Sequence, residues 1–300
     1  MTQTRRPGLL PATIRPVPSR HGGVAHVPAD AVPTEDNGPR LPAAGMARAQ
    51  VRLLGLDFTS LTLAQVASRL AEHPAGAPFG YVVTPNADHL VRVNHDSRLN
   101  SIYRNAVLCL LDSRVVFGLG RLVGLAMPKV VTGADLTAYL LEQHMRPDER
   151  ITIIGLSPAW LPALVARYDL VPPAHYDPPM GFENDPAAFD ATVAFVRDHP
   201  ARFVFLAVGS PRQEFLAAAI ATRGGATGTG LCVGAALEFL AGARRRAPGF
   251  MSRSGLEWLF RLVSEPRRMF RRYLINSPVV IALLVKQRLA AGRSGQEPHA

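Results

Sequence analysis

The sequence of 300 residues contains only two cysteines, Cys109 and Cys232, and no long apolar run. Both cysteines lie inside short apolar runs, which predicts buried free thiols in a reducing cytoplasm rather than a disulfide framework. No run approaches the roughly 18 apolar residues that a membrane-spanning helix requires. Arg5 and Arg6 are not followed by an apolar core of about 7–15 residues, which argues against a secretory or twin-arginine signal.

Sequence signatures of metal and dinucleotide sites are also missing. The nine histidines show no H-x-x-x-H or H-E-x-x-H spacing, and no D-x-D pair occurs. The nearest acidic cluster, Glu183-Asn184-Asp185, predicts a turn and a helix start before Pro186. The glycines of 118–124 are spaced one residue too widely for a dinucleotide fingerprint, and no acidic residue follows at about 20 positions, so a tightly packed segment is predicted there. We therefore expect no metal and no cofactor.

From about residue 49 the sequence alternates short apolar runs with longer amphipathic segments, which is typical of an α/β fold. Buried strands are predicted at 79–84, 106–111, 151–154 and 202–208, and a helix at 62–73. We expect a Rossmann-like sheet with flanking helices over 49–247, followed by a basic helical appendage over 248–300. Residues 1–48, with eight prolines and no apolar periodicity, are predicted to be a disordered leader.

Polar residues and glycines follow the predicted strands, at the sheet edge where open α/β folds bind ligands. Thr84 and Asn86 follow the first strand, Asp112 the second, Gly155 the third and the segment 209–214 the fourth. Asp112 could serve as a general base or as a structural acid that caps the next segment. Turns are commonly polar, so an ordinary turn would explain the residues at any one strand end. It explains polar residues at all four strand ends less well.

The segment Gly209-Ser210-Pro211-Arg212-Gln213-Glu214 is the sharpest local pattern. A strand, a glycine and then Ser-Pro predict a helix start whose backbone N–H groups can bind phosphate or uracil. Gln213 can donate and accept at once, which suits a base or a sugar hydroxyl. The alternative is ordinary helix capping, with Glu214 placed near the positive end of the helix dipole.

The positive charge is concentrated near the C-terminus. Residues 244–293 carry twelve basic side chains against two acidic ones, which equals the formal net charge of +10 for the whole chain. Four of these arginines, at 267, 268, 271 and 272, recur on one face of a predicted helix, and the apolar run 278–285 follows. This pattern predicts an interfacial segment on an anionic membrane, with a solvated basic surface as the alternative.

At these positions the sequence resembles the WecG/TagA/CpsF family of N-acetylmannosaminyltransferases, over about residues 52–275. The resemblance rests on a series of blocks in order: Thr84-Pro85-Asn86, the strand ending at Asp112, Thr132-Gly133-Ala134-Asp135-Leu136, 209–214, Gly234, Ala241-Gly242, Ala247-Pro248, Leu256-Glu257-Trp258, 265–268 and Arg272-Tyr273. One departure is Ser113, where the family usually has glycine, which leaves open a hexose or another N-acetylhexosamine as the transferred sugar.

The resemblance implies a cytoplasmic glycosyltransferase, peripheral on the inner face of the plasma membrane, that is inverting and metal-independent. It implies a UDP-sugar donor and a polyprenyl-diphosphate-linked saccharide acceptor in cell-surface polysaccharide synthesis. Asp112 would be the general base. The implied substrate-binding residues are Thr84 and Asn86 for acceptor and sugar, Gly209, Pro211, Gln213 and Glu214 for the nucleotide, Arg261, Arg268 and Arg271 for diphosphate and lipid headgroups, and also Gly133, Asp135 and Gly155.

Three other functions stay open at this point. The arginine-rich end would suit a nucleic-acid-binding protein, although no RNA- or DNA-binding motif is present and we expect no nucleic-acid partner. An α/β oxidoreductase is disfavoured by the broken glycine fingerprint. A non-catalytic polysaccharide-assembly protein is opposed only by Asp112. The donor sugar, the acceptor glycan and the oligomeric state, a homo-oligomer included, are not determined by the sequence.

Overall fold

The computed structural model describes residues 49–243 and 277–294. The chain enters the fold as a hairpin, in which β1 (Gln50–Leu53) pairs antiparallel with β2 (Leu56–Thr59). Leu54 and Gly55 both have positive φ, 50° and 81°, as a two-residue type I′ turn requires. The leader predicted at 1–48 lies outside the described residues.

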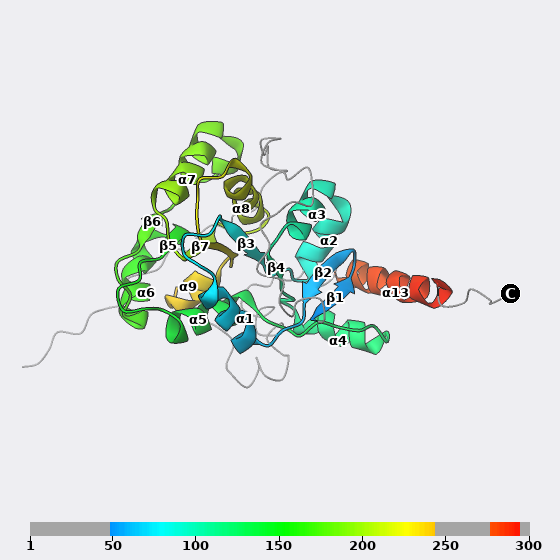
Figure 1. Ribbon diagram of the computed structural model, residues 1–300. Coiled ribbons are helices and arrows are strands. Elements are labelled where there is room, and N and C mark those ends of the chain that lie inside the picture. Colours follow the sequence, from blue (N-terminus) through cyan, green and yellow to red (C-terminus); the bar gives the residue numbers. More distant parts are fainter. Residues whose placement is uncertain (1–48, 244–276, 295–300) are drawn as a thin grey trace, which may run out of the picture.

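A six-stranded parallel sheet forms the centre of the molecule, in the order β4-β3-β8-β7-β5-β6 (Figure 1). Its strands are β3 (Gly80–Val83), β4 (Leu108–Cys109), β5 (Thr152–Gly155), β6 (Ala174–Tyr176), β7 (Phe203–Ala207) and β8 (Thr229–Cys232). Five of them are almost wholly buried, as expected of parallel strands covered on both faces. The prediction of a Rossmann-like α/β sheet is confirmed.

Two apolar cores, one on each face of the sheet, hold the helices. Neighbouring strand residues point to opposite sides, so that Val83 and Leu206 belong to one core and Val82 and Phe205 to the other. The first core holds the hairpin and α2 (Ala87–His95), α3 (Ser97–Arg104), α7 (Pro186–Asp198) and α8 (Arg212–Arg223). The second holds α1 (Leu63–Glu72), α5 (Gly133–Gln143), α6 (Leu161–Tyr168) and α9 (Ala236–Leu240).

Local predictions and structure agree closely in several places. The helix predicted at 62–73 is α1, with Thr62 and Gln65 forming a capping box. The acidic cluster 183–185 forms a short 3₁₀ turn (Phe182–Asn184), and Asp185 caps α7, as predicted. The strand expected at 106–111 is shorter, because only Leu108 and Cys109 join the ladder of β3. Both cysteines are buried free thiols.

The predicted tightly packed glycine segment forms part of a helix, α4 (Arg114–Leu122). Inside α4, a Cβ on Gly120 would come within 2.2 Å of the Met127 sulfur, so the backbone there has no room for a side chain. Gly120 is therefore tightly packed, whereas a Cβ on Gly118 would meet no atom within 4 Å.

The last described helix, α13 (Ser277–Ser294), packs against α2 and α4 at one end of the molecule (Figure 1). Val280 and Leu284 are fully buried in the first core. The sequence predicted the run 278–285 as an interfacial segment. The structure uses one face of that run for packing, and it leaves Ile281 and Val285 on the other face more than a third exposed, at 39% and 37%.

Candidate active site

The site lies at the carboxyl edge of the sheet, where several helices begin beside one another. Asn86 caps α2 through hydrogen bonds to the N–H groups of Asp88 and His89. Thr132 caps α5 by accepting from the N–H of Asp135 at 3.0 Å. Parallel strands bring these helix starts together, and the aligned backbone dipoles of the helices create a positive local potential suited to anions.

Asp112, Thr84 and Gly133 meet at this edge. The N–H of Gly133 donates to Oδ2 of Asp112 at 3.2 Å, and the Asp112 N–H donates to the carbonyl of Pro85 at 3.0 Å. Thr84 donates its hydroxyl to the Cys232 carbonyl at 3.2 Å. A Cβ on Gly133 would lie 3.0 Å from the Thr84 hydroxyl, so glycine permits this close approach. The half-buried carboxylate of Asp112 is thereby held at the end of the β3–β4 pair.

Ser113, the residue that departs from the family pattern, has a structural role. Its side chain caps α4 by accepting from the N–H of Val116 at 3.1 Å. The neighbouring Arg114 is exposed. The serine therefore fixes the helix start directly after Asp112.

Gly155 and Gly209 end neighbouring strands with positive φ, 89° and 83°. A Cβ on Gly155 would come within 2.8 Å of the Ala207 backbone, so the packing of β5 against β7 requires this glycine. His175 holds the turn by donating from Nε2 to the carbonyls of Gly155 and Leu156, at 3.0 and 2.9 Å. Close packing therefore accounts for Gly155.

The segment 209–214 forms the entrance to α8, as predicted, with a cis peptide bond before Pro211. Arg212, the first residue of α8, forms a largely buried ion pair with Glu183 at 3.7 Å. The sequence had indicated Glu183 only as part of a turn. The acidic residue instead fixes a cation at this helix start.

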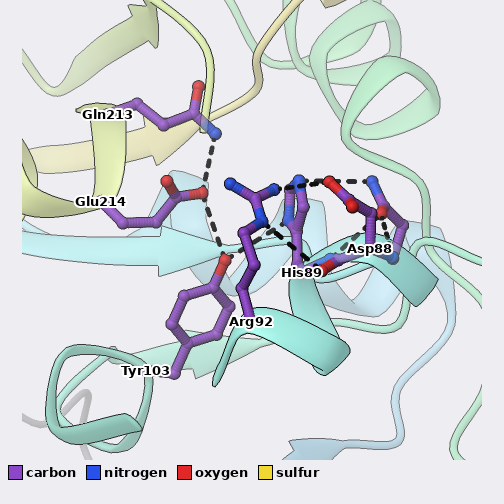
Figure 2. A network of polar contacts seen from close by, with 7 residues as sticks. Asp88, His89, Arg92, Tyr103, Gln213 and Glu214 are labelled. Carbon is purple, nitrogen blue, oxygen red and sulfur yellow. Dashed lines mark hydrogen bonds and ion pairs between the residues drawn. The ribbon is translucent and has the colours of Figure 1, made fainter. Parts of the chain in front are cut away.

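Gln213 and Glu214 point into the protein rather than toward solvent, with exposures of 2% and 1%. Gln213 accepts from the Gly234 N–H at 2.9 Å and donates to Oε1 of Glu214 at 3.0 Å (Figure 2). Both polar ends of its amide therefore already have partners within the protein. These bonds join the start of α8 to the loop after β8.

Four residues that sequence reasoning missed complete this network: Asp88, His89, Arg92 and Tyr103. Tyr103 of α3 donates its hydroxyl to Oε1 of Glu214 at 3.3 Å, and the same hydroxyl lies 3.3 Å from Nδ1 of His89 (Figure 2). Arg92, paired with Asp88 at 2.8 Å, lies beside them. No spacing in the sequence could reveal these contacts, because they join α2, α3 and α8.

Burial dominates the electrostatics of the network. It raises the pKa of Glu214, although the Gln213 hydrogen bond and the nearby Arg92 oppose the shift. Burial also raises the pKa of Tyr103 well above its ordinary value, with the Glu214 charge adding to the effect. Burial therefore acts against the charged forms of both side chains.

The remaining sequence-predicted residues are placed as follows. Asp135 lies in the first turn of α5, where its charge is favourable near the helix N-terminus. Arg261, Arg268 and Arg271 lie outside the described residues. Within 49–243 and 277–294, no group of three histidine, cysteine or acidic residues gathers as a metal site, and no helix has the length and apolarity to span a bilayer.

Comparison with known proteins identifies the family. Residues 51–294 match the model of the glycosyl transferase WecG/TagA/CpsF family. The chain belongs to this family of glycosyltransferases. It is also 27% identical, over 256 residues, to the N-acetylglucosaminyldiphosphoundecaprenol N-acetyl-beta-D-mannosaminyltransferase of Bacillus spizizenii, with 81% of this chain and 92% of that protein covered. The resemblance noted in the sequence is confirmed.

Proposed function

We propose that this glycosyltransferase moves a hexose or N-acetylhexosamine from a UDP-sugar to a polyprenyl-diphosphate-linked acceptor, with inversion and without a catalytic metal. The observation that carries the proposal is the position of Asp112, held by the Gly133 N–H where the helix starts converge. The Bacillus relative is named for transfer to a lipid-diphosphate-linked sugar, which supports the same acceptor class here.

Asp112 has the position of a general base. In a single displacement, an acceptor hydroxyl attacks the anomeric carbon while the bond to the UDP oxygen breaks, and the hydroxyl proton passes to the carboxylate. Because attack and departure occur on opposite faces of the sugar, the anomeric configuration inverts. The hydrogen bond from Gly133 fixes the orientation of the carboxylate for this transfer. Thr84 lies against Gly133 and would border the acceptor and sugar pocket.

The departing diphosphate needs compensation for its negative charge. The starts of α2, α5 and α8 at one edge supply N–H groups and favourable dipoles. The arginines of 244–276, Arg261, Arg268 and Arg271 among them, would supply charge that many glycosyltransferases take from a metal, because guanidinium groups bind phosphate oxygens in a bidentate manner. Gln213 would act on the nucleotide side by fixing the Gly234 loop, since its amide bonds inward.

Membrane association is the second part of the proposal. The helices α4 and α13, which pack against each other, contain no acidic residue, and they carry Arg114, Arg121, Lys286 and Arg288. Leu122 and Leu289 are 82% and 62% exposed on these helices. Apolar side chains flanked by cations suit an anionic bilayer surface. We place the enzyme on the cytoplasmic face, where a lipid-linked acceptor and a soluble UDP-sugar would meet.

A transfer assay tests the proposal directly. The purified chain is mixed with anionic vesicles that carry polyprenyl-diphosphate-N-acetylglucosamine and with single UDP-sugars, UDP-N-acetylmannosamine among them. UDP release and the anomeric configuration of the product are measured, with and without EDTA. We expect one donor to react, with inverted configuration and no effect of EDTA. Release no faster than with the Asp112→Asn variant, for every donor, would refute the function.

A further inference from the structure

We infer that Tyr103 is a positioning residue that couples the acceptor side of the site to the nucleotide side through its hydroxyl group. The inference rests on the proposed function, because it concerns the same site. Tyr103 touches neither Asp112 nor the strand exits in the contacts above. Its effect would pass through His89 and Glu214, which lie on two other helices (Figure 2).

The side chains form a continuous chain between two strand exits. Asn86, at the exit of β3, has its amide nitrogen 3.4 Å from Nε2 of His89. His89 and Glu214 both contact the Tyr103 hydroxyl, at 3.3 Å. Gln213 then connects Glu214 to the N–H of Gly234, at the exit of β8. The chain therefore starts and ends at the carboxyl edge that holds the site.

The chemistry of the groups fixes the direction of every bond. An amide nitrogen only donates, so Nε2 of His89 accepts from Asn86 and the proton of the neutral ring is on Nδ1. Nδ1 then donates to the Tyr103 oxygen, whose single proton goes to Oε1 of Glu214. Gln213 donates to the same oxygen. All the donors thus run toward Glu214, whose pKa is raised by burial.

Replacing the phenol oxygen would interrupt this chain at one point. The bonds at 3.3–3.4 Å are long, as polar contacts of a site often are before substrate binds. We expect them to shorten when both substrates are present. Without the Tyr103 oxygen, His89 of α2 would lose its side-chain link to Glu214 of α8, although β3 and β8 would still be joined by their ladder and by the Thr84 hydroxyl bond to Cys232. Misplacement of reacting groups lowers turnover more than it lowers binding.

A matched pair of variants separates positioning from simple stability. Tyr103→Phe removes the oxygen and keeps the ring. Tyr81→Phe makes the same change in a tyrosine of β3 that is equally buried. The Tyr81 hydroxyl donates to the carbonyl of Ile102 in α3 at 2.7 Å and takes no part in the network. We expect Tyr103→Phe to lower kcat about 2- to 10-fold, the range of one hydrogen bond. Tyr81→Phe should lower only the melting temperature. An equal loss of kcat in both variants would reduce Tyr103 to a structural residue.

A double-mutant cycle tests the coupling itself. Asn86→Ser keeps a helix cap but cannot reach His89, and Gln213→Ala cuts the other end of the chain. In the wild-type background we expect the two losses in kcat/KM to be non-additive, and in the Tyr103→Phe background to multiply independently. Independent losses in both backgrounds would overturn the inference.

The tautomer of His89 gives a readout that needs no enzymatic activity. We expect the ¹⁵N chemical shifts of the His89 ring to show the proton on Nδ1 in the wild type, and a change of that signal in Tyr103→Phe. A proton on Nε2 in the wild type would contradict the bond directions. If no UDP-sugar reacts but the tautomer is as expected, the proposed function fails and the network remains. If transfer is normal and the Tyr103→Phe variant has wild-type kinetics, the inference alone fails.

Discussion

Asp112 and Gly133 are joined by a single hydrogen bond, from the glycine N–H to the carboxylate Oδ2 at 3.2 Å. The bond connects the segment after β4 to the first turn of α5, 21 positions later in the sequence. Asp112 lies in the short connection between β4 and α4, and this bond fixes its carboxylate against the helix start, which is what a preorganised site requires.

Asp112→Asn should abolish transfer while preserving the fold. The amide oxygen can still accept from Gly133, but it cannot take a proton from the acceptor. We expect turnover to fall about 10²–10⁴-fold, the range of a general base, with UDP-sugar binding close to that of the wild type. Single-turnover kinetics and calorimetric titration measure the two effects. Near-normal turnover with weaker binding would make Asp112 a structural acid.

Gln213→Ala should raise the KM for the UDP-sugar. The change removes the acceptor of the Gly234 N–H and one donor to Glu214, so the loop after β8 loses its side-chain support. Steady-state kinetics with varied donor measure the effect. Gln143→Ala, an exposed position at the end of α5, is the control and should change nothing. An unchanged donor KM would remove Gln213 from the nucleotide side of the site.

Glu214→Gln should change how stability depends on pH. The pKa of this carboxyl is raised above 4.5 by burial, so the native state retains its proton at a pH where the unfolded chain has lost it. Its contribution is complete below the unfolded pKa and decreases as the pH rises through the folded value. The wild type should therefore lose stability across that window relative to the glutamine variant, in urea unfolding at a series of pH values. Parallel curves would mean that Glu214 titrates normally.

Two neighbouring residues of α13 should separate packing from membrane binding. Leu284 is fully buried, so Leu284→Ala should cost about 2–5 kcal/mol of unfolding free energy. Val285, the next residue around the helix, is 37% exposed, so Val285→Ala should leave stability within about 0.5 kcal/mol. Vesicle flotation should show the reverse order for variants that remain folded. Loss of stability in both would indicate that the exposed face packs as well.

Binding to anionic vesicles should decrease with salt. Each basic residue near such a surface contributes about 1 kcal/mol, so replacing Lys286 and Arg288 together should weaken binding by about 2 kcal/mol before screening. Flotation at several salt concentrations measures this, with neutral vesicles as the control. Equal binding to neutral and anionic vesicles would contradict an electrostatic contribution.

The sequence predicted the sheet because its strands are continuous apolar runs. Runs such as 202–208 are buried on both faces, and they are followed by glycine, by aspartate or by Pro85-Asn86. The hairpin of β1 and β2 was missed, since its polar residues alternate with apolar ones over only four residues each and its turn has Leu54 where asparagine is expected. Asp112 could be found because it ends an apolar run with a charge.

The inward direction of Gln213 could not be predicted from the sequence. Every residue of α8 from Gln213 to Ile220 is buried. This part of the helix therefore has no polar periodicity that would indicate a solvent-exposed side. The apolar run at 278–285 posed the opposite difficulty. A membrane surface and a protein core both select apolar residues, and only the fold shows that Val280 and Leu284 pack against the core.

The contact between α13 and the hairpin also determines when this part of the fold can be completed during synthesis. Gln287 accepts from the Leu54 N–H at 2.8 Å and donates to the Arg52 carbonyl at 3.2 Å, so the last described helix closes over the first described turn. During synthesis the hairpin leaves the ribosome more than 230 residues before Gln287. The side of the hairpin that contacts α13 therefore stays exposed until α13 has been made. A chain released early, before α13, would therefore expose part of its core, and we expect it to be cleared by proteolysis rather than to accumulate as an active enzyme.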